Sequence, residues 1–150
     1  MSEPDWKTDN RREGTLYGTL CGAQVSFIAY PFFIPKEPFL RYGNVRILPK
    51  KDIAVMKIVA ISQRGRKRDF IDLYWYSQHQ EPLIDVIKRL PEQYPSVAHD
   101  YHHILKSLVY FTDAENDPMP QLNFSADWDE VKNFFRREVT DAAKELLRIS

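Results

Sequence analysis

A lysine and two aspartates near the middle of the chain have the residue types and spacing that phosphate chemistry uses. Lys57 lies in the apolar run 53–61, where an ammonium group without a counter-charge would be costly to bury. Asp69 and Asp72 are three residues apart, so on a helix their carboxylates share one face. The functional hypothesis is that Lys57 contacts a phosphate while the carboxylates orient it or a metal. The structural alternative is a buried Lys–Asp bridge that fixes two neighbouring helices.

A cluster of cations lies between these groups and is a second candidate site. The cluster, called here the basic loop, consists of Arg64, Arg66, Lys67 and Arg68 around Gly65. Such clusters bind the phosphates of nucleotides or nucleic acids. Cations at the start of a helix oppose its dipole, so a bound anion would relieve repulsion and use the free N–H groups. We expect weak, salt-dependent binding of nucleotide or RNA here; the alternative is a solvated loop between helices.

Other reactive side chains favour no site. His99, His102 and His103, together with Asp100, have helical spacing that a zinc site uses, but a surface position is the simpler interpretation. Cys21 has no identifiable activating base, so a nucleophilic role is not expected. The sequence therefore predicts no metal ligands.

The candidate residues need helices to position them, and helical patterns occupy the second half of the chain. Strands are predicted over residues 15–20 and 24–30, which form a hairpin around the turn 21–23, and over residues 45–48. Helices are predicted over residues 53–61, 67–78, 81–90, 97–110 and 128–148. Asp52 and Asp127 are the expected N-caps of the first and last helix. The aromatic run 74–76 is expected to pack in the core rather than to stack on bases.

These elements predict an α+β fold, in which a small antiparallel β-element precedes a helical bundle. Residues 1–14 are expected to form a flexible leader, and residues 15–150 a single domain. Zero net charge hides an asymmetry: residues 36–68 carry ten Lys and Arg against two acids, whereas residues 113–150 carry nine acids against five bases.

The composition of the 150 residues excludes several protein classes. No apolar run reaches the roughly 18 residues of a membrane-spanning helix, and the polar first 13 residues do not form a secretory signal. The one cysteine cannot form an internal disulfide, which favours a reducing compartment, the cytoplasm. Aromatic residues make up 13% of the chain, which argues against intrinsic disorder.

The stretch from Asp52 to Tyr74 contains D-I-A-V-M-K and, further on, R-G-R-K-R-D-F-I-D-L-Y. This block resembles that of the AbiEii/AbiGii-type nucleotidyltransferase toxins, a family of phage-defence and toxin–antitoxin systems. Residues 108–115 and 128–135 also resemble the tail of the family, so the resemblance extends from about Thr15 to the C-terminus. It implies a partial nucleotidyltransferase-like domain, a substrate-phosphate role for Lys57, a catalytic or orienting role for Asp69 or Asp72, and a cognate antitoxin protein.

The sequence departs from the family upstream of this block. Complete relatives carry a Gly-rich motif and a strand with paired aspartates that hold Mg²⁺ on an NTP. Here the corresponding stretch offers Asp5 and Asp9 without a strand pattern. We therefore expect a truncated toxin-like protein that binds no cofactor alone and is inactive alone. The alternatives are a non-catalytic RNA- or protein-binding module that uses the basic loop, and a subunit that completes a site on another chain.

Overall fold

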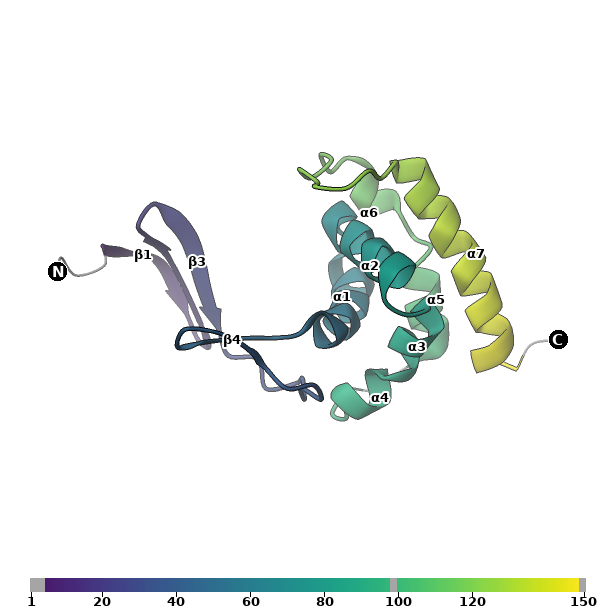
Figure 1. Ribbon diagram of the computed structural model, residues 1–150, viewed down its shortest axis with the longest axis horizontal. Helices are drawn as coiled ribbons and strands as arrows, with labels where there is room; N and C mark the ends of the chain where they lie inside the picture. Colours follow the sequence, from purple (N-terminus) through teal and green to yellow (C-terminus); the bar gives the residue numbers. More distant parts are fainter. Residues whose placement is uncertain (1–4, 98–99, 149–150) are drawn as a thin grey trace. The chain divides into compact units, whose positions relative to one another are not determined.

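The computed structural model describes residues 5–97 and 100–148, and the chain divides into two compact units, Met1–Pro31 and Phe32–Ser150. The first, the sheet unit, holds β1 (Trp6–Arg12), β2 (Thr15–Leu20) and β3 (Ala23–Ile28) in one antiparallel sheet of that order (Figure 1). The predicted hairpin is confirmed as β2–β3. Its turn, Cys21-Gly22, has φ angles of 50° and 81°, which is the backbone conformation of tight hairpin turns.

Strand β1 lies where the sequence predicted a flexible leader, so that prediction was wrong for residues 6–12. The strand pairs with β2 from Trp6 opposite Leu20 to Arg12 opposite Thr15, with one irregularity after Thr8. Its side chains are exposed apart from that of Trp6, which is half-buried. Strands are predicted from an alternation of apolar and polar residues. A strand with no buried face lacks this alternation, so β1 was not recognisable from the sequence.

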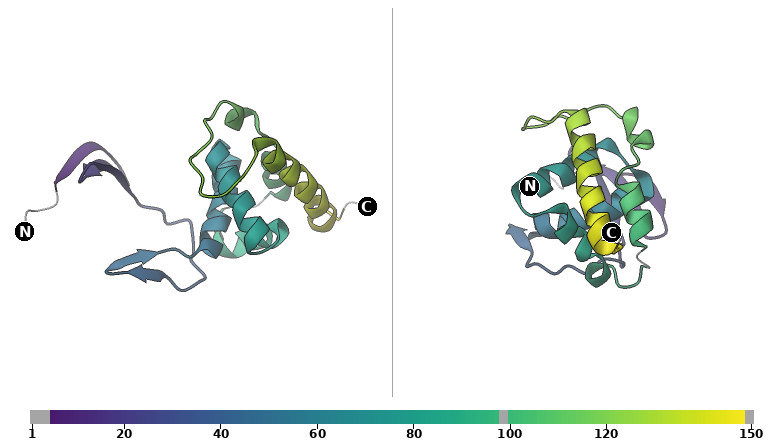
Figure 2. Two further views of the ribbon diagram at one scale, coloured as in Figure 1. Left: turned by 45° about the horizontal axis from the view of Figure 1, so that its top comes forward. Right: turned by 90° about the vertical axis from the view of Figure 1, so that its right-hand side faces the viewer.

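The second unit, the helical unit, begins with a short hairpin and continues as a bundle. Strand β4 (Leu40–Tyr42) pairs with β5 (Val45–Ile47); β5 was predicted, and β4 was not. The helices are α1 (Lys50–Arg64), α2 (Lys67–His79), α3 (Leu83–Lys88), α4 (Leu90–Gln93), α5 (Tyr101–Ser107), α6 (Thr112–Glu115) and α7 (Trp128–Leu146). Helix α1 packs against α2, α3 and α5, and α7 packs across α2, α3 and α5 (Figure 2). The α+β class is confirmed.

Helix ends follow local signals at some positions and long-range contacts at others. Asp127 caps α7 as predicted, since its carboxylate accepts from the backbone N–H groups of Asp129 and Glu130. Helix α1 ends at Gly65, whose φ of 51° lies in the left-handed region. Asp52, the predicted cap of α1, instead lies inside the helix and is buried.

The predicted helix over residues 97–110 is shorter in the structure. Helix α5 begins at Tyr101 because Asp100 caps it, accepting from the N–H groups of His102 and His103. It ends at Ser107, so the residues up to Tyr110 lie beyond it. Residue 99 is outside the described part of the chain.

The core of the helical unit is apolar and rich in aromatic rings. Phe70 of α2 is fully buried, and its ring centroid lies 5.2 Å from that of Phe111, 5.2 Å from that of Phe135 and 5.9 Å from that of Trp128. These tilted and edge-on contacts are favourable arrangements for aromatic pairs. The same packing fixes the orientation of α2, which carries Asp69 and Asp72. Among the described residues, no helix is long and apolar enough to span a membrane.

Candidate functional site

Lys57 of α1 bridges the two aspartates of α2, as the sequence predicted. Its Nζ lies 2.8 Å from Oδ1 of Asp69 and 2.7 Å from Oδ2 of Asp72. Gly65 ends α1 and lets the chain reverse, so the two helices run side by side and bring residues 12 and 15 positions apart into contact. The structure therefore assembles the three predicted site residues in one place.

Asp69 is the buried centre of this group. Its side chain has no exposed surface, and its second oxygen, Oδ2, accepts a hydrogen bond of 3.2 Å from Nε of Arg64. Both oxygens of the carboxylate are thus engaged by cations. Asp72, in contrast, is about half exposed, with 52% of its side-chain surface accessible. The two carboxylates have different environments, and only Asp72 is open to a ligand.

The charge state of Lys57 follows from its surroundings. Partial burial acts to lower its pKa, but the hydrogen bonds and charges of Asp69 and Asp72 outweigh burial, and the pKa is raised above the ordinary value of 10.5. The side chain is therefore an ammonium ion at neutral pH. It can neutralise a phosphate charge, and it is not a general base.

A cleft of about 210 Å³ opens beside this group. Lys57, Asp72 and Lys50 are the charged residues that line it, and the other lining residues are apolar or aromatic apart from one amide. These other residues are Ile53, Ala54, Trp75, Tyr76, Asn123 and Phe124. The cleft thus combines an apolar wall with two lysines and one exposed carboxylate, which is the usual composition of a small-ligand site.

Trp75 is the largest aromatic side chain that lines the cleft. Nζ of Lys50, which also lines the cleft, lies 4.7 Å from the ring centroid. The ring of His79, which does not line the cleft, is stacked on Trp75 with centroids 4.8 Å apart, and its Nδ1 lies 2.7 Å from the backbone oxygen of Trp75. Packing was predicted for the run 74–76, and Tyr76 is indeed buried, but Trp75 is only partly covered.

The sequence predicted that the basic loop is free to bind an anion, but in the structure most of its cations already have partners within the chain. Arg66 pairs with Asp117 at 2.9 Å, and the backbone N–H of Lys67 donates to the other oxygen of Asp117 at 3.0 Å. The Lys67 ammonium is buried and donates to the backbone carbonyls of Glu115 and Asp117. The start of α2 is therefore already occupied by a carboxylate of the same chain. Of the four cations, Arg68 alone is exposed without an ion pair to any described residue.

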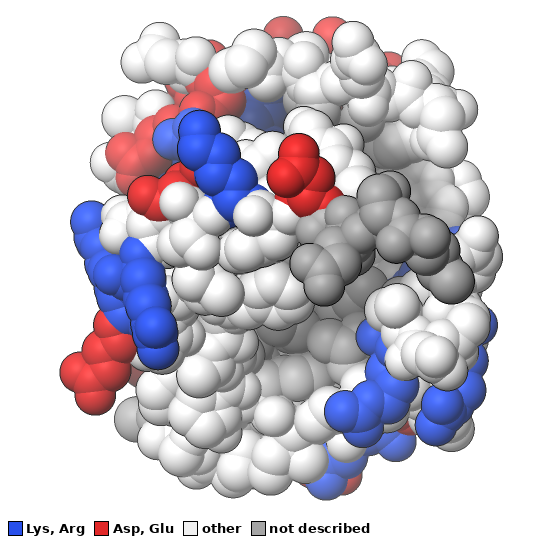
Figure 3. Space-filling view, turned by 90° about the vertical axis from the view of Figure 1, so that its left-hand side faces the viewer, with Lys and Arg blue, Asp and Glu red and all other residues white. Residues whose placement is uncertain are grey.

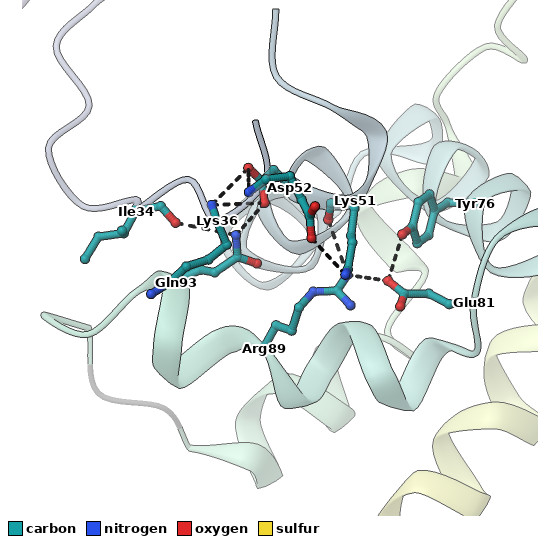
Figure 4. Close-up of polar contacts among 9 residues, drawn as sticks. Ile34, Lys36, Lys51, Asp52, Tyr76, Glu81, Arg89 and Gln93 are labelled. Carbon is teal, nitrogen blue, oxygen red and sulfur yellow. Dashed lines mark hydrogen bonds and ion pairs between the residues drawn. The ribbon is translucent and has the colours of Figure 1, made fainter. Parts of the chain in front are cut away.

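A second buried polar group, which sequence analysis did not find, holds the segment before the hairpin against the helices (Figure 4). The carboxylate of Asp52 accepts from the backbone N–H groups of Lys36 and Glu37 at 3.2 and 3.3 Å and from Nε2 of Gln93 at 2.7 Å. The backbone N–H of Ile34 donates to the Gln93 carbonyl at 2.8 Å. The signal in the sequence was a carboxylate at the third position of an apolar helix, which we interpreted as a cap.

Glu81 lies at the centre of a third group, near Tyr76 of the cleft wall (Figure 4). It accepts from the Tyr76 hydroxyl at 2.7 Å and forms an ion pair with Arg89. Burial and this hydrogen bond raise the pKa of Tyr76 well above its ordinary value, so the hydroxyl stays protonated. Burial acts to raise the pKa of Glu81 too, but the hydrogen bonds from Arg89 and Tyr76 lower it overall.

The described residues contain no cluster of three or more His, Cys, Asp or Glu side chains that would hold a metal ion. His102 and His103 lie on the exposed side of α5, and His99 is outside the described residues. Cys21 is exposed and free at the tip of the β2–β3 hairpin.

Comparisons with known proteins identify the family. The chain matches the family model described as "Nucleotidyl transferase AbiEii toxin, Type IV TA system" over residues 24–148. It is 36% identical over 129 residues to an uncharacterized protein, aq_aa25, of Aquifex aeolicus (strain VF5). The aligned part is 85% of this chain and 61% of that relative, so the chain spans about three fifths of the length of the curated relative. No solved structure matches the chain. The chain belongs to the AbiEii nucleotidyl transferase toxin family of type IV toxin–antitoxin systems.

Proposed function

We propose that the helical unit binds the nucleotide substrate of a nucleotidyl transferase toxin, with a phosphate at Lys57. The observation that carries the proposal is the position of Lys57 at the cleft, held by Asp69 and Asp72 at 2.8 and 2.7 Å. An ammonium group has three donors, and these aspartates use two of them. The third donor is left for a ligand, and the raised pKa keeps the positive charge in place.

The size of the cleft indicates which part of the nucleotide enters it. At about 210 Å³ it is smaller than the roughly 300–1,000 Å³ of sites that enclose a whole drug-sized ligand. It suits a nucleoside, with the base on the indole of Trp75 and the phosphates outside, beside Lys57. Base–aromatic stacking contributes about 1–3 kcal/mol per base. Lys50 now covers the ring face, and it would move toward the phosphates.

The two aspartates take different roles in this proposal. Asp69 is a positioning residue, because it is buried and both of its oxygens are engaged by Lys57 and Arg64. Asp72 is exposed enough to accept from a ribose hydroxyl while it also holds Lys57. The pair therefore orients the cation and one edge of the nucleotide.

The described carboxylates do not suit the Mg²⁺ that nucleotidyl transfer requires. A metal on a triphosphate needs free carboxylate oxygens close together. Those of Asp69 are both engaged, which leaves Asp72 as a single exposed carboxylate among the described residues of the site. We infer that this chain alone binds nucleotide without transferring it, and that the metal-binding carboxylates come from another segment or subunit. In a toxin–antitoxin pair, a cognate antitoxin would oppose the completed activity.

Nucleotide binding is tested by calorimetric titration with ATP, GTP, CTP and UTP. Lys57→Met is expected to weaken binding of the preferred nucleotide about 10- to 100-fold, because a hydrogen bond to a charged group contributes about 1.5–3 kcal/mol. Lys57→Arg keeps the charge and shows whether loss of binding is due to misfolding. Lys106→Met, an exposed lysine of α5 outside the cleft, is the matched control. Equal binding by wild type and Lys57→Met would refute the phosphate role.

Nucleotide transfer is tested with radiolabelled NTPs, Mg²⁺ and total RNA or protein. The chain alone is expected to give no labelling above background. Mg²⁺-dependent labelling that disappears in Lys57→Met would show that this chain contains a complete active site.

A further inference from the structure

The β4–β5 hairpin carries two arginines that lie at directly opposed positions. Arg41 and Arg46 are directly paired across the hairpin. Neither makes an ion pair with any residue in the described ranges 5–97 and 100–148. Like charges at directly opposed positions destabilise a strand pair, so the arrangement costs stability unless an anion lies between them. We propose that Arg41 and Arg46 form a phosphate-binding site for single-stranded nucleic acid.

The contrast with the basic loop supports this assignment. Arg64 and Arg66 are held by Asp69 and Asp117, and Lys67 is buried. The hairpin segment 39–47 contains two arginines and no acid. Figure 3 shows one face of the molecule, on which some Lys and Arg side chains lie beside acidic side chains and others beside uncharged ones. Unpaired cations are the ones that gain most from a phosphate.

Each face of the hairpin has its own composition. Side chains alternate along a strand, so Leu40, Tyr42, Val45 and Ile47 share one face, and Arg41 and Arg46 lie on the other. Phe39 precedes β4, and its ring centroid lies 5.2 Å from the guanidinium carbon of Arg46. The ring is 41% exposed. The arginine face thus combines two guanidinium groups with one accessible aromatic ring.

This combination matches the chemistry of a single strand. A guanidinium group forms two parallel hydrogen bonds to a phosphate, and two groups side by side bind one phosphate or two consecutive ones. An exposed ring stacks on an unpaired base, which a duplex does not offer. An acidic peptide would also satisfy the charges, but it would make no use of Phe39. None of these residues lines the cleft at Lys57, so the site is distinct from the proposed nucleotide site.

The test is the salt dependence of binding to labelled oligouridylate and oligothymidylate, measured by fluorescence anisotropy between about 50 and 200 mM NaCl. Each phosphate contact to a single strand contributes about −0.7 to the slope of log K against log[salt]. Replacing both arginines, Arg41→Ala with Arg46→Ala, is expected to make the slope less negative by about 1.4. Replacing both by lysine keeps the slope and lowers the affinity, since the forked contacts are lost. Phe39→Leu is expected to weaken binding with little change in slope.

Arg66→Ala is the matched control, because Arg66 is an exposed arginine whose charge Asp117 already balances. It is expected to leave the slope unchanged. An unchanged slope in the double alanine variant, or an equal change in Arg66→Ala, would overturn the proposal. The proposal would also be overturned if polyglutamate of equal charge displaced labelled oligouridylate from the protein. Preference for one oligonucleotide shows that the site also contacts the 2′-hydroxyl or the base methyl group, and equal binding assigns the site to the shared phosphate backbone.

Discussion

The two units of the chain differ in how far their side chains are buried. In the helical unit, Asp52, Lys67 and Asp69 are buried, and each is engaged by hydrogen bonds or ion pairs inside an apolar core. In the sheet unit, Gly18 is the one buried residue among residues 5–31. Five of the six side chains of β3 are exposed. The helical unit is therefore stabilised by burial, and the sheet unit by its backbone hydrogen bonds and very few side-chain contacts.

This difference shows where the chain can position reactive groups. A side chain such as Lys57 keeps its orientation because its partners are fixed by a packed core. The contacts of the sheet unit centre on Trp6, whose indole lies against Gly18 and has its ring centroid 5.8 Å from that of Phe27. We therefore expect mutations to have large effects in the helical unit and small ones in the sheet, with Gly18 as the exception.

The largest expected effect is that of Phe70→Ala. Removing this fully buried ring is expected to lower the free energy of unfolding by about 3–5 kcal/mol, because it leaves a cavity among three other aromatic rings. Ile28→Ala, at a residue that is 56% exposed in β3, is the control and should change stability by less than about 0.5 kcal/mol. Urea unfolding followed by circular dichroism measures both. Similar losses in the two variants would remove the contrast between the units.

Asp69→Ala is expected to be the next most damaging. It leaves Lys57 and Arg64 without their shared buried carboxylate, and breaking a buried pair in this way costs about 3 kcal/mol. Asp72→Ala removes the half-exposed partner of the same lysine and should cost less than about 1 kcal/mol. Urea unfolding of the two variants side by side provides the comparison. A larger loss for Asp72→Ala would mean that Asp69 is not the structural anchor.

Gly18→Ala tests the exception in the sheet. An added Cβ would lie 2.3 Å from the Trp6 ring and 2.6 Å from the carbonyl oxygen of Lys7, so β1 has to shift. Overpacking of this kind costs about 1–3 kcal/mol. Hydrogen exchange should become faster at the amides of β1 and β2 and stay unchanged in α2. Gln24→Ala, at an exposed side chain of β3, is the control, and unchanged exchange in β1 would contradict the contact.

The smallest expected effect is the pH dependence due to Glu81. Its pKa is below the ordinary value of 4.5 in the folded chain, so its stabilising contribution is complete above that value and is lost as the pH falls through the lowered pKa. Glu81→Gln is expected to lose about 1 kcal/mol near pH 7, because its charge-assisted hydrogen bond with Arg89 is lost, and to show a flatter decline as the pH falls below 4.5. Thermal unfolding at each pH measures this, with Asp141→Asn on the exposed side of α7 as control. Parallel curves for wild type and Glu81→Gln would rule the contribution out.

Local signals in the sequence predicted much of the helical unit. The apolar pattern and Gly65 located the reversal between α1 and α2, and Asp127 marked the start of α7. The meeting of Lys57 with Asp69 followed from helical spacing and the cost of burying an ammonium group. These predictions succeeded because each depends on residues close together in the sequence.

The errors arose where distant residues decide the outcome. Asp117 is fifty positions from Lys67, so nothing near the basic loop indicated that its cations were already paired. Asp52 accepts from Gln93 and from a segment 15 and 16 residues upstream, which a helix-capping rule does not consider. Strand β1 has exposed polar side chains, and its place depends on pairing with β2.

Lys67 determines which changes this part of the chain tolerates. Its ammonium donates to the carbonyls of residues 115 and 117 at 3.2 and 2.6 Å, and it lies 5.1 Å from the ring centroid of Trp128. Every amino acid supplies a backbone carbonyl, so replacing Glu115 keeps this contact of the lysine. An inserted or deleted residue within 112–117 would shift both carbonyls away from the ammonium. Among natural variants, the length of this turn is therefore expected to stay constant, and Asp117 is expected to keep its carboxylate for Arg66 and the N–H of Lys67.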